Sequence, residues 1–133
     1  MLRRIDHVAF AVADLDAAIH LYESAWGLTL AHREVVADQG VEEAMFALGD
    51  SYVQLIAPLS GSSTVAKFLE RRGEGLHHIA YEVDDLSAEL AAAVDRGQRL
   101  IDKAPREGGR GTRIAFVHPV TNHGVLVELV EYQ

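Results

Sequence analysis

The stretch Ile5–Leu15, IDHVAFAVADL, decides the fold, because a similar stretch, LHHIAYEVDDL, recurs at Leu76–Leu86. When the two are laid over each other, His7 falls on His78 and the same alternation of apolar residues surrounds both. Alternation of this kind is typical of a half-buried β-strand. A recurrence over such a distance predicts that the chain contains two copies of one structural unit.

In both copies the strand is followed by an aspartate and then by a helical stretch that ends at a glycine. Asp14 and Asp85 are good candidates for the N-cap, because a short side chain with an acceptor oxygen is favoured there. Glycine is favoured just beyond the C-terminal end of a helix. We therefore expect helices at Leu15–Trp26 and Leu86–Arg96, with Gly27 and Gly97 ending them.

Three further strands are expected in each copy after its helix. Gly49-Asp50 has the composition of a hairpin turn, and Pro119–His123 is a turn-rich connection. A linker at Pro58–Ser63 and a short helix at Thr64–Arg71 join the two copies. The expected strands are Leu28–Arg33, Glu42–Leu48 and Ser51–Ala57 in the first copy, and Arg99–Lys103, Thr112–His118 and Gly124–Tyr132 in the second.

This order of elements makes each copy a βαβββ module. Module 1 covers residues 1–58, the linker and short helix cover 59–73, and module 2 covers 74–133. A chain of 133 residues fits a single domain of common size. We expect an α+β fold in which the two tandem βαβββ modules form a curled, mixed and mostly antiparallel sheet around a metal-binding cleft.

The composition excludes several classes of function. The absence of cysteine excludes disulfides, thiolate metal sites and cysteine nucleophiles. A formal net charge of −8 disfavours nucleic-acid binding, which requires a basic surface. No stretch approaches the roughly 20 apolar residues of a membrane span, and the N-terminus lacks the apolar run of a signal peptide. We therefore expect a cytoplasmic protein that binds neither nucleic acid nor membrane.

Four polar side chains interrupt the apolar strands at matched places in the two copies. Because side chains alternate across a strand, each histidine shares its face with small alanines, which leave room for a ligand. A carboxylate among apolar neighbours is costly to bury unless it is paired, and metal coordination removes that cost. Two imidazoles, an amide oxygen and a carboxylate suit one divalent ion, with Co²⁺ preferred and Mn²⁺, Ni²⁺ or Zn²⁺ as alternatives. The four residues are His7, Gln54, His78 and Glu128.

Each of these residues also has a structural interpretation. A lone histidine in a strand is more often a hydrogen-bonded core or surface residue, and Gln54 or Glu128 can face water from an edge strand. Their matched positions in a duplicated unit favour the shared site. His77 points to the other side of its strand, so it cannot bind the same ion as its neighbour. Glu82 is expected at the rim of the same face.

The chain resembles the vicinal oxygen chelate superfamily, which includes glyoxalases, bleomycin resistance proteins and dioxygenases, and within it the methylmalonyl-CoA epimerase family. The resemblance covers nearly the whole chain, through IDHVAFAV, DQGVEEAMF, YVQLIAPL, STVAKFL, GEGLHHIAYEV, GTRIAFVHP and HGVLVELV. It implies that Glu43, and not the neighbouring Glu42, is the catalytic glutamate. The metal ligands that it implies are the same four residues: His7, Gln54, His78 and Glu128.

The activity implied by the resemblance is metal-dependent epimerisation of methylmalonyl-CoA. The 2R and 2S forms would interconvert by proton abstraction at C2 through a metal-stabilised enolate. Glu43 would be the first base and Glu128 its partner, with a water as the alternative to Glu128. The acyl-CoA tail would meet basic residues and the glycine-rich loop, although this loop is equally consistent with a flexible hairpin bearing solvated arginines. The candidate contacts are Lys67, Arg106, Gly109, Arg110 and Arg113.

The family resemblance also makes a homodimer the expected assembly. Other activities of the superfamily remain open at this point: a glyoxalase-type isomerase, an extradiol-type dioxygenase or a non-catalytic module that binds small molecules. Gln54 argues against the dioxygenase, whose iron is held by two histidines and one carboxylate.

Overall fold

The structure is a computed structural model that describes every residue from Met1 to Gln133. Its contacts divide the chain into two units, and strands β1 (Leu2–Ala11) and β5 (Gly75–Val83) each contribute to both. We call His7–His77 the N-terminal unit, and Met1–Asp6 together with His78–Gln133 the C-terminal unit. Each unit has its own buried apolar cluster.

In the N-terminal unit the strands pair in the order β2-β3-β4-β1. The β1–β4 pair is parallel, and the other two pairs are antiparallel. After β1, the elements of this unit are α1 (Leu15–Trp26), β2 (Leu30–Val36), a 3-10 turn (Ala37–Gln39), β3 (Val41–Leu48), β4 (Ser51–Pro58) and α2 (Thr64–Arg72).

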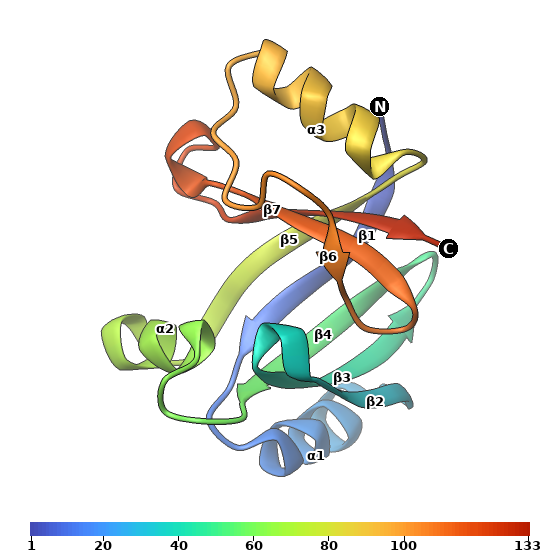
Figure 1. Ribbon diagram of the computed structural model, residues 1–133. Coiled ribbons are helices and arrows are strands. Elements are labelled where there is room, and N and C mark those ends of the chain that lie inside the picture. Colours follow the sequence, from blue (N-terminus) through green and yellow to red (C-terminus); the bar gives the residue numbers. More distant parts are fainter. The chain divides into compact units, whose positions relative to one another are not determined.

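Helix α1 covers one face of this sheet (Figure 1). Ile19 of the helix packs in one buried cluster with Phe46 of β3 and Leu55 of β4. The ring of Tyr22 stacks on Phe46, with 5.7 Å between the ring centroids. The helix starts at Asp14, whose side chain accepts the backbone N–H of Ala17, as the sequence predicted. With α1 on one face, the buried polar residues of the strands lie on the other.

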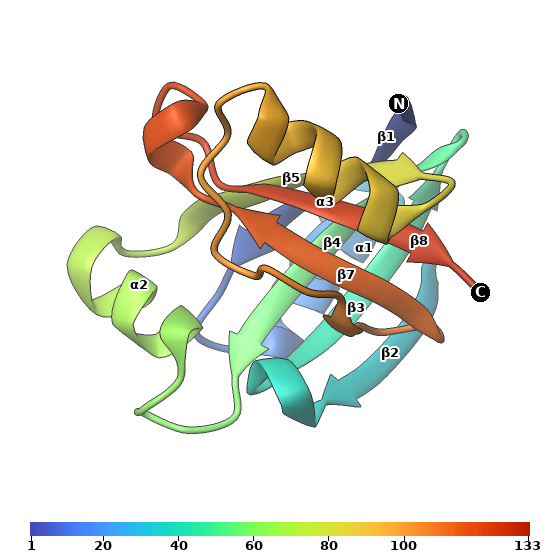
Figure 2. The same ribbon diagram turned by 45° about the horizontal axis from the view of Figure 1, so that its top comes forward.

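The C-terminal unit repeats this arrangement, with strand order β1-β5-β8-β7-β6. The β5–β8 pair is parallel, and β8–β7 and β7–β6 are antiparallel. Helix α3 lies along β7 and β8 (Figure 2), where Leu90 packs with Ala115 and Leu129. The elements after β5 are α3 (Leu86–Asp95), β6 (Arg106–Glu107), β7 (Thr112–Val117), a 3-10 turn (Pro119–Thr121) and β8 (Val127–Tyr132).

The α+β class and the two βαβββ modules are therefore confirmed, but the strand predicted at Arg99–Lys103 is wrong. Only Leu100 makes an isolated bridge there, to Val117. The carboxylate of Asp102 accepts the backbone N–H of Phe116 at 2.9 Å, so a side chain takes the place of a backbone partner. The strand that fills this position in the module is the short β6, which pairs with β7.

Two other strands begin later than the sequence predicted. The first residue of the predicted Leu28–Arg33 strand instead bonds back to the helix, because the Leu28 N–H donates to the carbonyl of Tyr22. Strand β2 consequently begins at Leu30, and it runs on to Val36. Strand β8 begins three residues after Gly124, because a turn precedes it in which the Val125 N–H donates to the carbonyl of Asn122.

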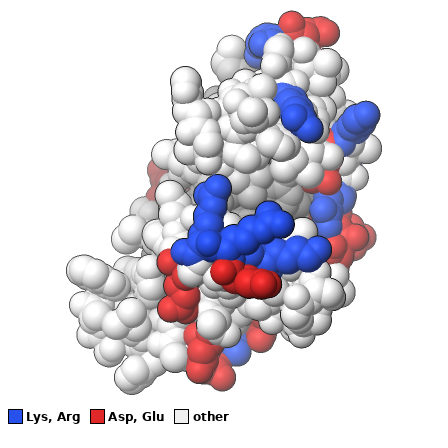
Figure 3. Space-filling view, turned by 90° about the vertical axis from the view of Figure 1, so that its left-hand side faces the viewer, with Lys and Arg blue, Asp and Glu red and all other residues white.

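Helix α2 packs on the sheet face opposite α1, with Val65 buried among residues of β1, β3 and β4. Its N-cap is Ser63, whose hydroxyl accepts the N–H of Ala66. Figure 3 faces the side on which α2 lies and shows Lys and Arg side chains gathered there beside acidic ones. The exposed basic residues of α2 are Lys67, Arg71 and Arg72. None of the helices is both long enough and apolar enough to span a membrane.

The position of Phe46 under α1 gives a direct test of the packing. Replacing Phe46, which is fully buried, with alanine should lower the free energy of unfolding by about 3–5 kcal/mol, because it leaves a cavity in the core. Leu48→Ala, two residues along and 55% exposed, should change it by less than about 0.5 kcal/mol. Urea unfolding followed by circular dichroism measures both. Equal effects of the two substitutions would contradict this packing.

Candidate metal centre

In the N-terminal unit the register of the strands places three polar residues on the face away from α1. Residues directly opposite each other in neighbouring strands share a face. Gln54 lies opposite Met45 on one side and Ala9 on the other, and Glu43 lies two residues before Met45. His7, two residues before Ala9, shares this face by the same alternation.

The C-terminal unit carries the matching positions. Glu128 lies opposite Ala80 of β5 and Phe116 of β7, just as Gln54 lies opposite Ala9 and a residue of β3. His78, two residues before Ala80, brings its Nε2 to 3.7 Å from Oε1 of Glu128. The edge of the Phe116 ring meets the His78 ring at an interplanar angle of 86°, with 5.4 Å between centroids. The repeat seen in the sequence is therefore a repeat of strand register.

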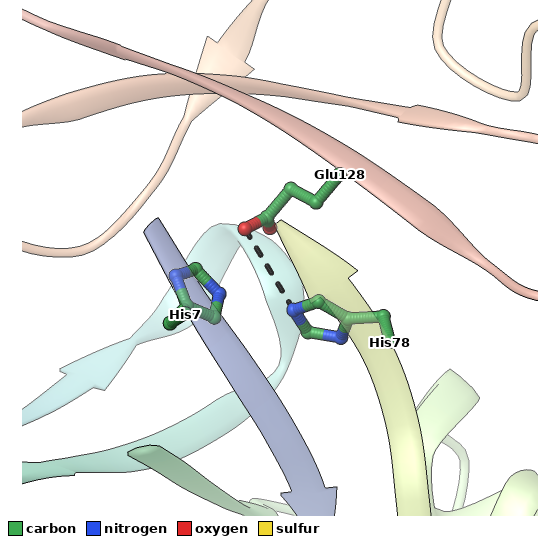
Figure 4. Close-up of side chains that lie close together, drawn as sticks. All are labelled: His7, His78 and Glu128. Carbon is green, nitrogen blue, oxygen red and sulfur yellow. Dashed lines mark ion pairs between the residues drawn. The ribbon is translucent and has the colours of Figure 1, made fainter. Parts of the chain in front are cut away.

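His7, His78 and Glu128 form a group that can hold a metal ion. Their ligand atoms all lie within 4.8 Å of one another, and all three residues are buried. Figure 4 shows the three side chains directed toward one point, with the His78–Glu128 pair marked. Two donors on opposite sides of one ion, each about 2.1 Å from it, are about 4.2 Å apart. The spacing of the three is therefore close to what a bound ion requires.

Gln54 adds an independent sign that a polar ligand belongs here. The residue is only 8% exposed, and its side-chain oxygen Oε1 is buried without a hydrogen-bond partner. Leaving a buried acceptor unsatisfied costs about 1–3 kcal/mol. A cation would satisfy an amide oxygen, and the set of two imidazoles, one carboxylate and one amide oxygen suits a borderline divalent ion. The side chains present therefore fit such a metal.

The two neighbouring glutamates of β3 lie on opposite faces. Glu43 is 3% exposed and shares the face of Gln54. The carboxylate of Glu42 lies on the other face and accepts a hydrogen bond from Nε of Arg33 at 2.9 Å. Of these two glutamates, only Glu43 is on the side of the sheet where the metal-ligand candidates lie.

The residues that sequence reasoning suggested for the acyl-CoA tail are arranged in different ways. Lys67 is exposed on α2, whereas Nη1 of Arg113 lies 3.8 Å from Glu131 and Nη1 of Arg106 lies 3.5 Å from Asp102. The carbonyl of Gly109 accepts a hydrogen bond from the Thr112 hydroxyl at 2.7 Å, so the glycine-rich loop is internally bonded. The guanidinium of Arg110 is engaged by a buried carboxylate.

That buried carboxylate is Asp6, which sequence analysis did not single out. Asp6 is fully buried in the C-terminal unit and is paired with Arg4 at 3.2 Å and Arg110 at 3.0 Å. It also accepts a hydrogen bond from the hydroxyl of Tyr132, and that hydroxyl accepts one from Arg110. The signal in the sequence was an aspartate inside an apolar strand, where this residue type is uncommon and predicts a charge partner.

The Tyr132 hydroxyl provides a test of this network. Partial burial and the hydrogen bond to Asp6 together raise the pKa of Tyr132 to about 12. An unfolded chain loses the tyrosine proton near pH 10, so the folded state keeps a proton that the unfolded state releases. The stabilisation from this group should be complete below about pH 10 and disappear as the pH rises toward about 12.

Urea unfolding at about pH 9 and about pH 11.5 measures this loss. Tyr132→Phe should show a smaller loss over the same interval, and its phenolate absorbance should lack the last tyrosine to titrate. Identical losses in the two proteins would contradict the contact between Tyr132 and Asp6.

A duplicated βαβββ fold with a paired His, Gln and Glu set defines the class of protein. Residues 6–116 match the family described as the Glyoxalase/Bleomycin resistance protein/Dioxygenase superfamily. The ethylmalonyl-CoA/methylmalonyl-CoA epimerase of Cereibacter sphaeroides is 36% identical over 97% of this chain and 98% of its own.

Solved structures give the same result. A single-residue variant of Streptomyces coelicolor methylmalonyl-CoA epimerase, in complex with 2-nitronate-propionyl-CoA, is 43% identical, with a TM-score of 0.94 over 99% of this chain and 96% of that one. A methylmalonyl-CoA epimerase in complex with methylmalonyl-CoA and ammonium has the same identity, TM-score and coverage. The chain therefore belongs to the methylmalonyl-CoA epimerases of the glyoxalase superfamily.

Proposed function

We propose that this protein interconverts the 2R and 2S forms of methylmalonyl-CoA, with a divalent ion held by His7, Gln54, His78 and Glu128 and with Glu43 as the base. The observation that carries the proposal is the buried polar set on the strand faces away from α1 and α3, including the unsatisfied oxygen of Gln54. Membership of the epimerase family and the methylmalonyl-CoA bound by one relative support the choice of substrate.

The reaction requires removal of a weakly acidic proton from C2 and its return to the other side. A divalent ion held by the four ligands would supply Lewis-acid stabilisation to the negative charge that develops on the thioester oxygen. Glu43 takes the proton at C2, and its buried position keeps competing water away from the carboxylate. The residues opposite Gln54 and Glu128 on these faces, Ala9 and Ala80, add no side-chain bulk beyond Cβ.

The duplication provides a carboxylate of this kind in one module only. Glu43 lies opposite Ile56, two residues beyond Gln54, and the residue opposite the matching Val130 is Ile114. No second Glu43 therefore exists in the C-terminal unit to protonate the other side of C2. We assign that role to the second oxygen of Glu128, with a water as the alternative proton donor.

Several finer points belong to the same proposal. Co²⁺ is the preferred ion, the protein acts as a homodimer in the cytoplasm, and the acyl-CoA tail runs past exposed Lys67. The other predicted contacts with the tail stay predictions: Arg113, Gly109 and Arg110. Each of these residues already has a partner within the C-terminal unit.

A metal-binding measurement distinguishes the roles of the two adjacent histidines of β5. His78→Ala should weaken Co²⁺ binding by at least about 100-fold, since it removes a direct ligand and not just a supporting contact. His77→Ala should leave the affinity unchanged, because that ring packs edge-on against Phe68, with 4.8 Å between centroids. Calorimetric titration of metal-free protein with Co²⁺ measures both. Unchanged affinity in His78→Ala would remove this residue from the ligand set.

The base is tested by the matched pair of glutamates on β3. Glu43→Gln should slow exchange of the C2 proton of methylmalonyl-CoA with deuterated solvent by about 10²–10⁴-fold, while Co²⁺ affinity stays unchanged. Glu42→Gln, on the opposite face, should keep the wild-type rate. Proton NMR of the substrate follows the exchange. A full rate in Glu43→Gln, or loss in Glu42→Gln instead, would contradict the assignment.

A further inference from the structure

Part-way along strand β2, a shift in register changes which of its residues lie on each face of the sheet. At its start, Leu30 lies opposite Phe46 and packs with the cluster under α1. The register then shifts between Leu30 and His32, which is a β-bulge. Beyond the bulge, His32 lies opposite Met45, a residue on the other face of the sheet. Bulges redirect side chains in this way and are frequent beside active sites.

The bulge brings a second carboxylate next to the proposed base. Glu34 lies directly opposite Glu43 in the β2–β3 register, so the two side chains share one face. Directly opposite residues of antiparallel strands have Cβ atoms about 4.5–5.5 Å apart. Without the extra residue of the bulge, His32 and Glu34 would turn toward the α1 side. The register therefore gives Glu43 a neighbour that can exchange protons with it.

The two side chains of β2 are much more exposed than Glu43. The Glu43 residue is 3% exposed, whereas the side chains of Glu34 and His32 are 36% and 31% exposed. Oε1 of Glu34 lies 2.7 Å from Nε2 of His32, a short hydrogen-bond distance. Three groups that bind protons, Glu43, Glu34 and His32, thus lie on one face of the sheet, and two of them reach solvent.

We propose that Glu34 and His32 form a proton relay that exchanges the proton of Glu43 with solvent. The proposal rests on the role of Glu43 in the proposed function. It assigns a task to His32 and Glu34, which sequence analysis did not single out.

The proton balance of the relay is simple. When the C2–H bond breaks, its electron pair stays on the substrate and the proton forms an O–H bond on Glu43. Glu43 then passes a proton to the carboxylate of Glu34, and Glu34 passes one to Nε2 of His32, whose other ring nitrogen releases one to water. Glu43 and Glu34 return to carboxylates, His32 regains its starting tautomer by exchanging its ring protons with water, and no oxidant, reductant or other reactant is needed.

The relay controls how often the proton on Glu43 is replaced from solvent before it returns to C2. A His32–Glu34 pair with only a structural role would leave this proportion unchanged. A proton held on Glu43 either returns to C2 or is replaced from solvent. With substrate in deuterated water, wild-type protein should place deuterium in recovered, unconverted substrate as well as in product. Glu34→Gln keeps the shape but cannot take up the proton, so the abstracted proton should return to C2 more often.

The experiment measures deuterium in recovered substrate by NMR and conversion by the ratio of the two epimers, both at early times. In Glu34→Gln the ratio of exchange to conversion should fall at least about tenfold, and added imidazole should restore it by carrying the proton instead. His32→Gln should show a smaller fall in the same ratio. This second variant also keeps the test valid if Glu34→Gln folds poorly. Glu42→Gln is the matched control and should keep the wild-type ratio.

A wild-type ratio in both Glu34→Gln and His32→Gln would overturn the relay. Equal losses of exchange and conversion without rescue by imidazole would also overturn it, since that result indicates a structural role. If wild-type protein neither exchanges nor converts the substrate, the proposed function itself fails, and that outcome is distinct from the other two.

Discussion

The parallel pairing of the first and last strands of each module is the constraint on which the rest of the structure depends. It sets Gln54 beside Ala9 and Glu128 beside Ala80, each two residues beyond a histidine. Both alanines are fully buried and carry nothing beyond Cβ, so the histidine, the glutamine and the glutamate have room around them. A slip of one residue in either pairing would turn the whole polar set toward a helix.

The two modules keep the ligands and differ in their other buried polar groups. The N-terminal unit buries Glu43 where the C-terminal unit has Ile114. The C-terminal unit buries Asp6 and neutralises it with Arg4 and Arg110. A buried carboxylate with two cationic partners is a stable structural element, whereas one placed on the same face as the candidate metal ligands suits proton transfer. The duplicated fold thus places the candidate metal ligands at matching positions in both modules, whereas it places the proposed base in one module only.

Much of this could be predicted from the sequence, because local signals agree with the fold. The aspartate caps, the helices and the alternation that puts the histidines on one face all follow from nearest neighbours in the chain. The errors arise where a contact between distant segments decides the outcome. Asp102 replaces a strand partner at Phe116, and the bulge before His32 exists only relative to β3. Two partners of Asp6, Arg110 and Tyr132, come from the other end of the chain and leave no mark near it.

The central claim is that both modules supply ligands to one ion. X-ray absorption at the cobalt edge of Co²⁺-loaded protein tests it most directly, because imidazole rings give a scattering pattern that oxygen ligands lack. The account predicts two imidazoles per cobalt in the wild type, with oxygen donors completing the shell, and one imidazole in either His7→Ala or His78→Ala. A wild-type cobalt bound by one imidazole or none, or a shell unchanged by both substitutions, would contradict it.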